Sequence, residues 1–208
     1  MRVTAITKQR REGRVNLYLD GRFALGLTLD AVAAAGLRVG DEIDDDTLRS
    51  LRRNAAGADA TAAAMRLLSY RPRSEAELRQ RLAGRGAPAD IVDESISRLR
   101  ELGLVDDAAF ARTWVDGRSR LSPRSQRLLR RELQAKGIEG EAAREALVPL
   151  DDEDAALRAA ERRAGAMRGL PYPEFRRRLG DFLRRRGFDP ATVRRTAERL
   201  WQDAGSCG

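Results

Sequence analysis

The chain of 208 residues contains no histidine, and its one cysteine is Cys207. The lack of histidine removes the commonest general base, the serine–histidine–aspartate triad and imidazole metal sites. A single cysteine can form neither an internal disulfide nor a thiolate zinc cluster. Aromatic residues make up only 5% of the sequence, whereas alanine and leucine are frequent. This composition favours packed helices over a β-sandwich and gives no support to common hydrolytic or zinc-dependent chemistry.

Long apolar runs are also lacking. The longest, around residues 31–35, is far too short to cross a bilayer, and residues 1–4 do not open a signal segment. We therefore expect a cytoplasmic protein that has no membrane partner.

Lysine is scarce as well, because Lys8 and Lys136 are the only two among 40 basic residues. The net charge is +8, with 32 acidic residues interspersed among the arginines. An excess of arginine predicts a polyanionic partner, either nucleic acid or an acidic protein surface. A salt-bridged helical surface would have a similar composition, so charge alone leaves both interpretations open.

What the chain does contain is an internal repeat of proline, leucine and glycine. The three copies are offset by 51 and then 50 residues, and they are Pro72, Leu78, Leu82, Gly86 and Leu99; Pro123, Leu129, Leu133, Gly137 and Leu150; and Pro173, Leu179, Leu183, Gly187 and Leu200. Repeats of this period are typical of stacked helical units that share one core. The leucines then fill the core, and the glycines end helices in the left-handed conformation.

Each copy is expected to form three helices. In the first copy they cover about 58–69, 74–84 and 89–102, and the Ser74-x-x-Glu77 pattern predicts a capping box at the second helix. The corresponding helices are expected near 106–119, 122–136 and 141–148, and then near 151–167, 173–186 and 190–202. The third copy departs from the others because Phe175 stands where Ser74 and Ser125 stand in the first two.

The first thirty residues follow a different pattern. Residues 3–7, 15–19 and 23–27 alternate as half-buried strands do, and Asp20-Gly21 is a strong hairpin signal. A short helix over 30–35 should end at Gly36. The predicted fold class is therefore mainly α, with tandem three-helix repeats in an elongated curved stack preceded by a small antiparallel β-meander. We expect domains at 1–57, 58–104, 105–150 and 151–203, and a flexible tail at 204–208.

A run of carboxylates, Asp41, Glu42 and Asp44–Asp46, could be read as the metal site of a nuclease. However, an apolar helical pattern at Leu48 and Leu51 follows at once. Acidic residues at this position cap a helix and oppose its dipole. We therefore interpret the run as a helix start, and we expect no metal site, no cofactor and no catalytic residue.

Three stretches, residues 67–78, 103–115 and 130–138, resemble the RecX recombination regulators. They read LLSYRPRSEAEL, GLVDDAAFARTWV and RRELQAKGI. The resemblance is strongest over about 62–150, continues more weakly through the third repeat, and is compatible with the N-terminal hairpin region. It implies a non-catalytic protein that binds the RecA recombinase and its nucleoprotein filament. It also implies inhibition of the RecA ATPase and of strand exchange, as part of the control of DNA repair and the SOS response.

Arginines cluster near the second helix of each repeat, and we predict that they contact the RecA filament or phosphate groups. Arg124, Arg127 and Arg131 have the spacing of one helix face. The predicted binding residues are Arg71, Arg73, Arg79, Arg120, Arg124, Arg127, Arg130, Arg131, Arg177, Arg178, Arg184 and Arg185. Two alternatives remain open: non-specific binding of single- or double-stranded DNA, and a scaffold with an unrelated protein partner. The expected form is a monomer.

Overall fold

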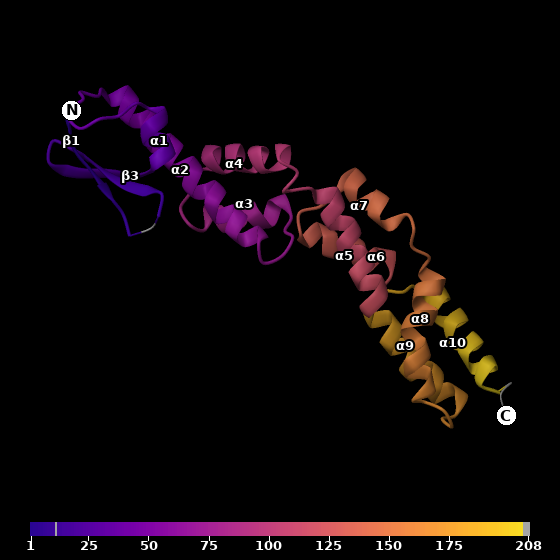
Figure 1. Cartoon of the computed structure of the whole chain (residues 1–208). Coiled ribbons are helices and arrows are strands. Elements are labelled where there is room, and N and C mark those ends of the chain that lie inside the picture. The colour runs from indigo at the N-terminus through magenta and orange to yellow at the C-terminus, as the bar shows by residue number, and fades with distance from the viewer. Residues whose placement is uncertain (11, 206–208) are drawn as a thin grey trace. The chain divides into compact units, whose positions relative to one another are not determined.

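The computed structural model describes residues 1–10 and 12–205 (Figure 1). Cys207 and most of the expected tail lie outside these described residues. The chain divides into two compact units, and the second unit begins at Asp106. In the described part, no helix is both long enough and apolar enough to pass through a bilayer.

The N-terminal strands form the predicted meander. Strands β1 (Val3–Lys8), β2 (Arg14–Leu19) and β3 (Arg22–Thr28) pair antiparallel in the order β1-β2-β3. Asp20 and Gly21 both have positive φ, at 47° and 80°, as a two-residue hairpin turn requires. Alternate side chains of β2 enter the core, and Leu17 is fully buried there. The short helix α1 (Leu29–Ala34) follows, close to its predicted position.

The long helix α2 (Asp45–Leu68) begins at the predicted carboxylate cap, but it continues through residue 58, where a separate helix was expected to start. Asp44 caps α2, and Gly57 does not interrupt it, since a glycine in a helix interior costs only about 1 kcal/mol. The first half of α2 buries Leu48 and Leu51 in the core of the sheet. The second half buries Ala63 in the core of the first repeat. One helix therefore supports two cores.

The predicted three-helix repeats are confirmed. In the first, α3 (Glu75–Ala83) and α4 (Ala89–Glu101) pack beside α2 (Figure 1). The second consists of α5 (Asp107–Leu121), α6 (Gln126–Ala135) and α7 (Gly140–Leu147). The third consists of α8 (Asp152–Gly165), α9 (Tyr172–Arg185) and α10 (Pro190–Gly205). The six repeated leucines of the second helices are all at most 1% exposed: Leu78, Leu82, Leu129, Leu133, Leu179 and Leu183.

The caps explain how the second helices start. The Ser74 hydroxyl accepts a 3.2 Å hydrogen bond from the amide of Glu77, and Ser125 accepts one of the same length from Leu128. In the third repeat α9 begins earlier, after Pro171. Phe175 is therefore inside that helix, where it is buried, and its ring centroid lies 5.2 Å from that of Trp201. The loss of the capping serine thus coincides with an aromatic contact in the core.

Within the second unit, the start of α6 lies against the end of α9. The Ser125 amide donates a 3.0 Å hydrogen bond to the Arg186 carbonyl. Gly187 has φ of +88°, and a Cβ placed on it would lie 2.6 Å from the Ser125 hydroxyl. Glycine is therefore needed at this position for the close contact as well as for the turn. This contact brings the arginines before and within α6 near those at the end of α9.

Candidate partner-binding surface

In the first repeat, the three predicted binding arginines have intramolecular partners. Arg71 bonds Glu77 at 2.9 Å, and Arg79 pairs with Asp93. The Nε of Arg73 donates to the carbonyl of Leu67 at 3.1 Å. Hydrogen bonding to Glu77 raises the pKa of Arg71, while partial burial lowers the pKa of Arg73. These side chains support the local fold of the first repeat.

In the second repeat, the expected common face of Arg124, Arg127 and Arg131 is wrong for Arg124. Helix α6 begins at Gln126, so Arg124 precedes it, and its guanidinium pairs with Glu132. Arg127 and Arg131 do lie one turn apart on α6, and both are exposed. Arg120 and Arg130 are exposed too, and within the described residues neither has an ion-pair partner.

Glu132 is the polar centre of the second repeat. Its carboxylate accepts hydrogen bonds from Trp114 Nε1 at 2.9 Å, from Arg118 Nε at 3.0 Å and from Arg124. Arg118 also lies over the Trp114 ring, 4.7 Å from its centroid. Only 15% of the Glu132 side chain is exposed. This carboxylate of α6 therefore links α6 to α5 and to Arg124 in the segment before α6.

Four arginines gather where the start of α6 meets the end of α9: Arg124, Arg127, Arg185 and Arg186, which we call the junction cluster. Arg186 lies over the ring of Phe182 at 4.2 Å, and its buried Nε has no hydrogen-bond partner within the described residues. Desolvation, followed by the charges of Arg124 and Arg185, lowers the pKa of Arg186. Arg127 donates to the carbonyl of Gly187 at 3.2 Å.

The junction cluster therefore concentrates positive charge in a partly desolvated place. Buried or partly buried charges are normally paired, and of these four arginines only Arg124 forms an ion pair with a carboxylate in the part of the chain described. Guanidinium groups in this arrangement suit a phosphate or carboxylate oxygen. The sequence prediction includes Arg124, Arg127 and Arg185 but omits Arg186. The sequence signal that could have identified Arg186 is Phe182, which lies one helical turn before it, because a guanidinium at that spacing can pack over the aromatic ring.

In the third repeat, the predicted arginines of α9 are exposed. Arg178 pairs with Glu174 at 2.6 Å, and Arg184 pairs with Asp181 at 2.7 Å. The hydrogen bond from Arg184, together with the charges of Arg177 and Arg185, lowers the pKa of Asp181. Of these three arginines, Arg184 is the one that forms an ion pair with Asp181 in the described chain, and positive charge remains in excess on this part of α9.

The acidic run before α2 acts as a helix start. The Asp44 carboxylate accepts a 2.7 Å hydrogen bond from the Thr47 amide, and hydrogen bonding to the Thr47 side chain, followed by this amide bond, lowers the pKa of Asp44. Asp41 accepts from the amide of Arg38 at 2.6 Å, and Asp46 pairs with Arg49. Among the described residues, no group of three or more acidic or thiol side chains could hold a metal ion.

The fold places the chain in the class of tandem three-helix repeat proteins with a small N-terminal sheet. Family models for the RecX N-terminal domain and for the first, second and third RecX three-helix domains match residues 1–44, 60–99, 106–147 and 151–196. The chain belongs to the RecX family of regulatory proteins.

Individual relatives agree with this assignment. The chain is 29% identical over 201 residues to the regulatory protein RecX of Lactobacillus gasseri, covering 95% of this chain and 74% of that one. It is 34% identical over 149 residues to RecX of Chlorobium limicola, covering 72% of this chain and 94% of that one. A crystal structure of regulatory protein RecX superposes with a TM-score of 0.73 at 24% identity, covering 95% and 98% of the two chains. RecX from Lactobacillus salivarius superposes at 0.62 with 23% identity, covering 70% and 96%.

Proposed function

We propose that this protein is a non-catalytic regulator that binds the RecA recombinase or its nucleoprotein filament along the filament groove. Binding inhibits the RecA ATPase and strand exchange. The observation that carries this proposal is the match of RecX domain models along both units, from the sheet to the third repeat.

The junction cluster is the contact surface that we favour. Arg127 and Arg185 are exposed, whereas Arg124 and Arg186 are half-buried beside them. A RecA–DNA filament offers carboxylates on its protein surface and phosphates along its DNA. A planar guanidinium binds either group with two parallel hydrogen bonds. Inhibition then follows from occupancy, because a protein in the groove excludes a second DNA strand and restrains the protomers that it contacts.

The decisive experiment titrates the full chain into a RecA ATPase assay on single-stranded DNA. We expect inhibition by the native chain and a loss of about tenfold or more in potency for Arg127→Glu/Arg185→Glu, since two charge-assisted contacts become repulsive. Arg194→Glu/Arg199→Glu is the matched control, because it changes the net charge equally at two exposed arginines of α10. If the native chain leaves the ATPase rate unchanged, the proposed function is wrong. If both double variants inhibit as the native chain does, the junction cluster is not the contact surface.

Non-specific DNA binding is the second candidate, and the positive charge that Arg124, Arg185 and Arg186 bring together favours it, because phosphate groups would neutralise that charge. Fluorescence anisotropy with naked single- and double-stranded DNA distinguishes the two candidates. A DNA-binding protein should bind naked DNA as tightly as it binds filaments, with affinity falling steeply as salt is added. A filament regulator should prefer the filament.

A further inference from the structure

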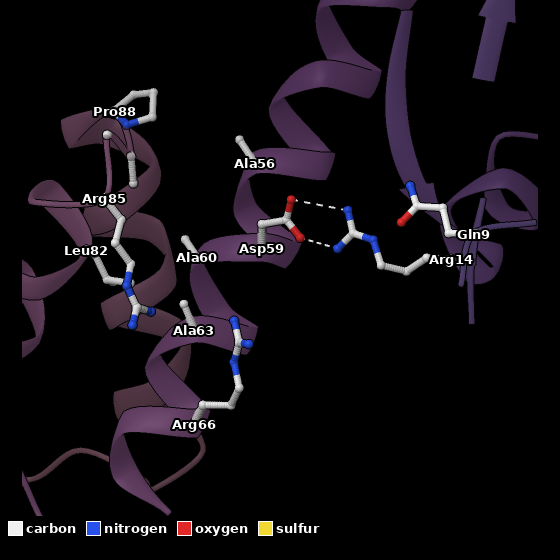
Figure 2. A pocket seen from close by; sticks show the side chains of 12 residues that line it. Gln9, Arg14, Ala56, Asp59, Ala60, Ala63, Arg66, Leu82, Arg85 and Pro88 are labelled. Atoms are coloured by element: carbon white, nitrogen blue, oxygen red, sulfur yellow. Dashed lines mark hydrogen bonds and ion pairs between the residues drawn. The ribbon is translucent and has the colours of Figure 1, made fainter. Parts of the chain in front are cut away.

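The first unit contains a groove that neither the sequence prediction nor the proposed function uses. Its volume is about 550 Å³, and it lies between one face of α2, the β1–β2 end of the sheet and the loop from α3 to α4. Gln9 and Arg14 come from the sheet side, and Arg85 and Pro88 come from the loop (Figure 2). All of these elements belong to the same compact unit.

The floor of the groove is made of alanine. Ala56, Ala60 and Ala63 are spaced four and three residues apart on α2, so they share one face of the helix. Their side chains are short, and they leave the space that larger side chains would fill. Leu82 and Pro88 extend the apolar lining on the side of α3 and α4. The groove can therefore accept an apolar side chain.

Three arginines line the groove, but they are not equivalent. The guanidinium of Arg14 makes two hydrogen bonds to Asp59, which raise the pKa of Arg14 and match its charge (Figure 2). The Nε of Arg66 makes only a weak 3.4 Å contact with the carbonyl of Ala62, within its own helix. The guanidinium of Arg85 has no ion-pair or hydrogen-bond partner within the described residues, and both Arg66 and Arg85 are exposed. Two positive charges thus stand uncompensated beside an apolar floor.

We propose that this groove binds a short acidic segment of a partner protein. An apolar side chain of the segment lies on the alanine floor, and its carboxylates pair with Arg66 and Arg85. A nucleic acid fits less well, because none of the described lining residues is aromatic and could stack on a base. The proposal does not depend on the identity of the partner or on an effect on RecA.

The test measures binding of a short fluorescein-labelled peptide of glutamate and leucine to the full chain by anisotropy. Its counterpart, in which glutamine replaces every glutamate, tests the need for charge. We expect Arg66→Glu/Arg85→Glu to weaken binding of the acidic peptide by about tenfold or more, since two attractive pairs become repulsive. Arg52→Glu/Arg98→Glu, at two exposed arginines of the same unit that do not line the groove, should bind within about twofold of the native chain.

Two further variants guard against a change in folding. Arg66→Gln/Arg85→Gln removes the charges without reversing them, and Ala56→Phe fills the floor. Each of these variants should bind the acidic peptide more weakly than the native chain does, while the urea concentration at the midpoint of unfolding stays the same. The proposal is overturned if the acidic peptide does not bind, if the glutamine peptide binds equally well, or if the groove variants bind as the control does. It is also overturned if oligothymidylate displaces the peptide at equal concentration, because the groove would then be a nucleic-acid site. None of these outcomes involves RecA, so they are independent of the ATPase assay.

Discussion

The indole Nε1 of Trp114 donates a 2.9 Å hydrogen bond to the carboxylate of Glu132, which lies 18 residues further along the chain. Arg118 and Arg124 donate to the same carboxylate. In the sequence, the segment around Arg130 and Arg131 is mainly basic. The neighbouring acid, Glu132, is nevertheless the residue that connects Trp114, Arg118 and Arg124 in the second repeat. Glu132 fixes where Arg124 lies, and through it one edge of the junction cluster.

We predict that Glu132→Ala lowers the free energy of unfolding by about 1–3 kcal/mol, because three donors lose their acceptor in a partly buried place. Urea unfolding followed by circular dichroism measures the change. Glu141→Ala is the control, since its ion pair with Arg144 is exposed, and such pairs contribute about 0.2–1 kcal/mol. Equal effects of the two substitutions would show that Glu132 does not have the structural role assigned to it.

A second prediction concerns the repeated glycine. Gly86 and Gly187 occupy equivalent positions and have nearly the same φ, +83° and +88°. Alanine at either position adopts a left-handed conformation that costs about 1–2 kcal/mol. At Gly187 the new Cβ also meets Leu128 Cβ at 2.7 Å, whereas at Gly86 it meets nothing within 4 Å.

Gly187→Ala should therefore lower the melting temperature more than Gly86→Ala does, and thermal unfolding of the two single variants measures the difference. Similar shifts would mean that backbone conformation alone explains the glycine, and that the contact between α6 and α9 adds nothing.

Much of the fold can be predicted from the sequence because its signals are local. Leucines four residues apart define a helix face, Ser74 caps its own helix, and Asp20-Gly21 sets its own turn. Each of these features depends on residues that are close together in the sequence, so it can be predicted without knowledge of the tertiary structure. The sequence does not predict that α2 is one continuous helix, because a glycine such as Gly57 can either end a helix or be tolerated inside one, and its neighbours do not distinguish the two cases.

The candidate surfaces are harder to predict, because they depend on contacts between distant residues. Arg127 meets Gly187 across 60 positions, and Arg14 meets Asp59 across 45. Helical spacing predicts that Arg124 lies on the same face as Arg131. However, α6 begins only at Gln126, after Arg124, and the guanidinium of Arg124 pairs with Glu132. A count of arginines locates basic segments, but only the fold shows which of the charges are already paired.

This distinction gives a third prediction. Arg124→Glu places a carboxylate beside Glu132 and should lower the free energy of unfolding by about 1–3 kcal/mol. Arg131→Glu, at an exposed position with no ion pair among the described residues, should change stability by less than about 0.5 kcal/mol. Urea midpoints of the two variants test this. If Arg124→Glu is as stable as Arg131→Glu, the ion pair with Glu132 does not hold Arg124 in place.

The last prediction concerns pH and the start of α10. The Asp189 carboxylate accepts hydrogen bonds from the hydroxyl of Thr192 at 2.6 Å and from the amides of Thr192 at 3.1 Å and Ala191 at 2.8 Å. These bonds, that of the Thr192 hydroxyl first, lower the pKa of Asp189 in the folded state. A lowered pKa means that the stabilisation is fully present above the unfolded value of about 3.9 and is lost as the pH falls through the lower folded value.

Asp189→Ala should therefore destabilise the second unit by about 1 kcal/mol at neutral pH, as the loss of a helix cap does. The gap between the native chain and the variant should narrow as the pH falls below about 4, because the carboxylate of the unfolded chain binds a proton there first and the native carboxylate follows at its lower pKa. Asp189→Asn, which keeps an acceptor oxygen but carries no charge, should retain part of the stability and show less dependence on pH. Urea unfolding at a series of pH values measures all three chains. A gap that stays constant between neutral and acidic pH would show that the charge of Asp189 does not contribute, and that only its shape and its hydrogen bonds matter.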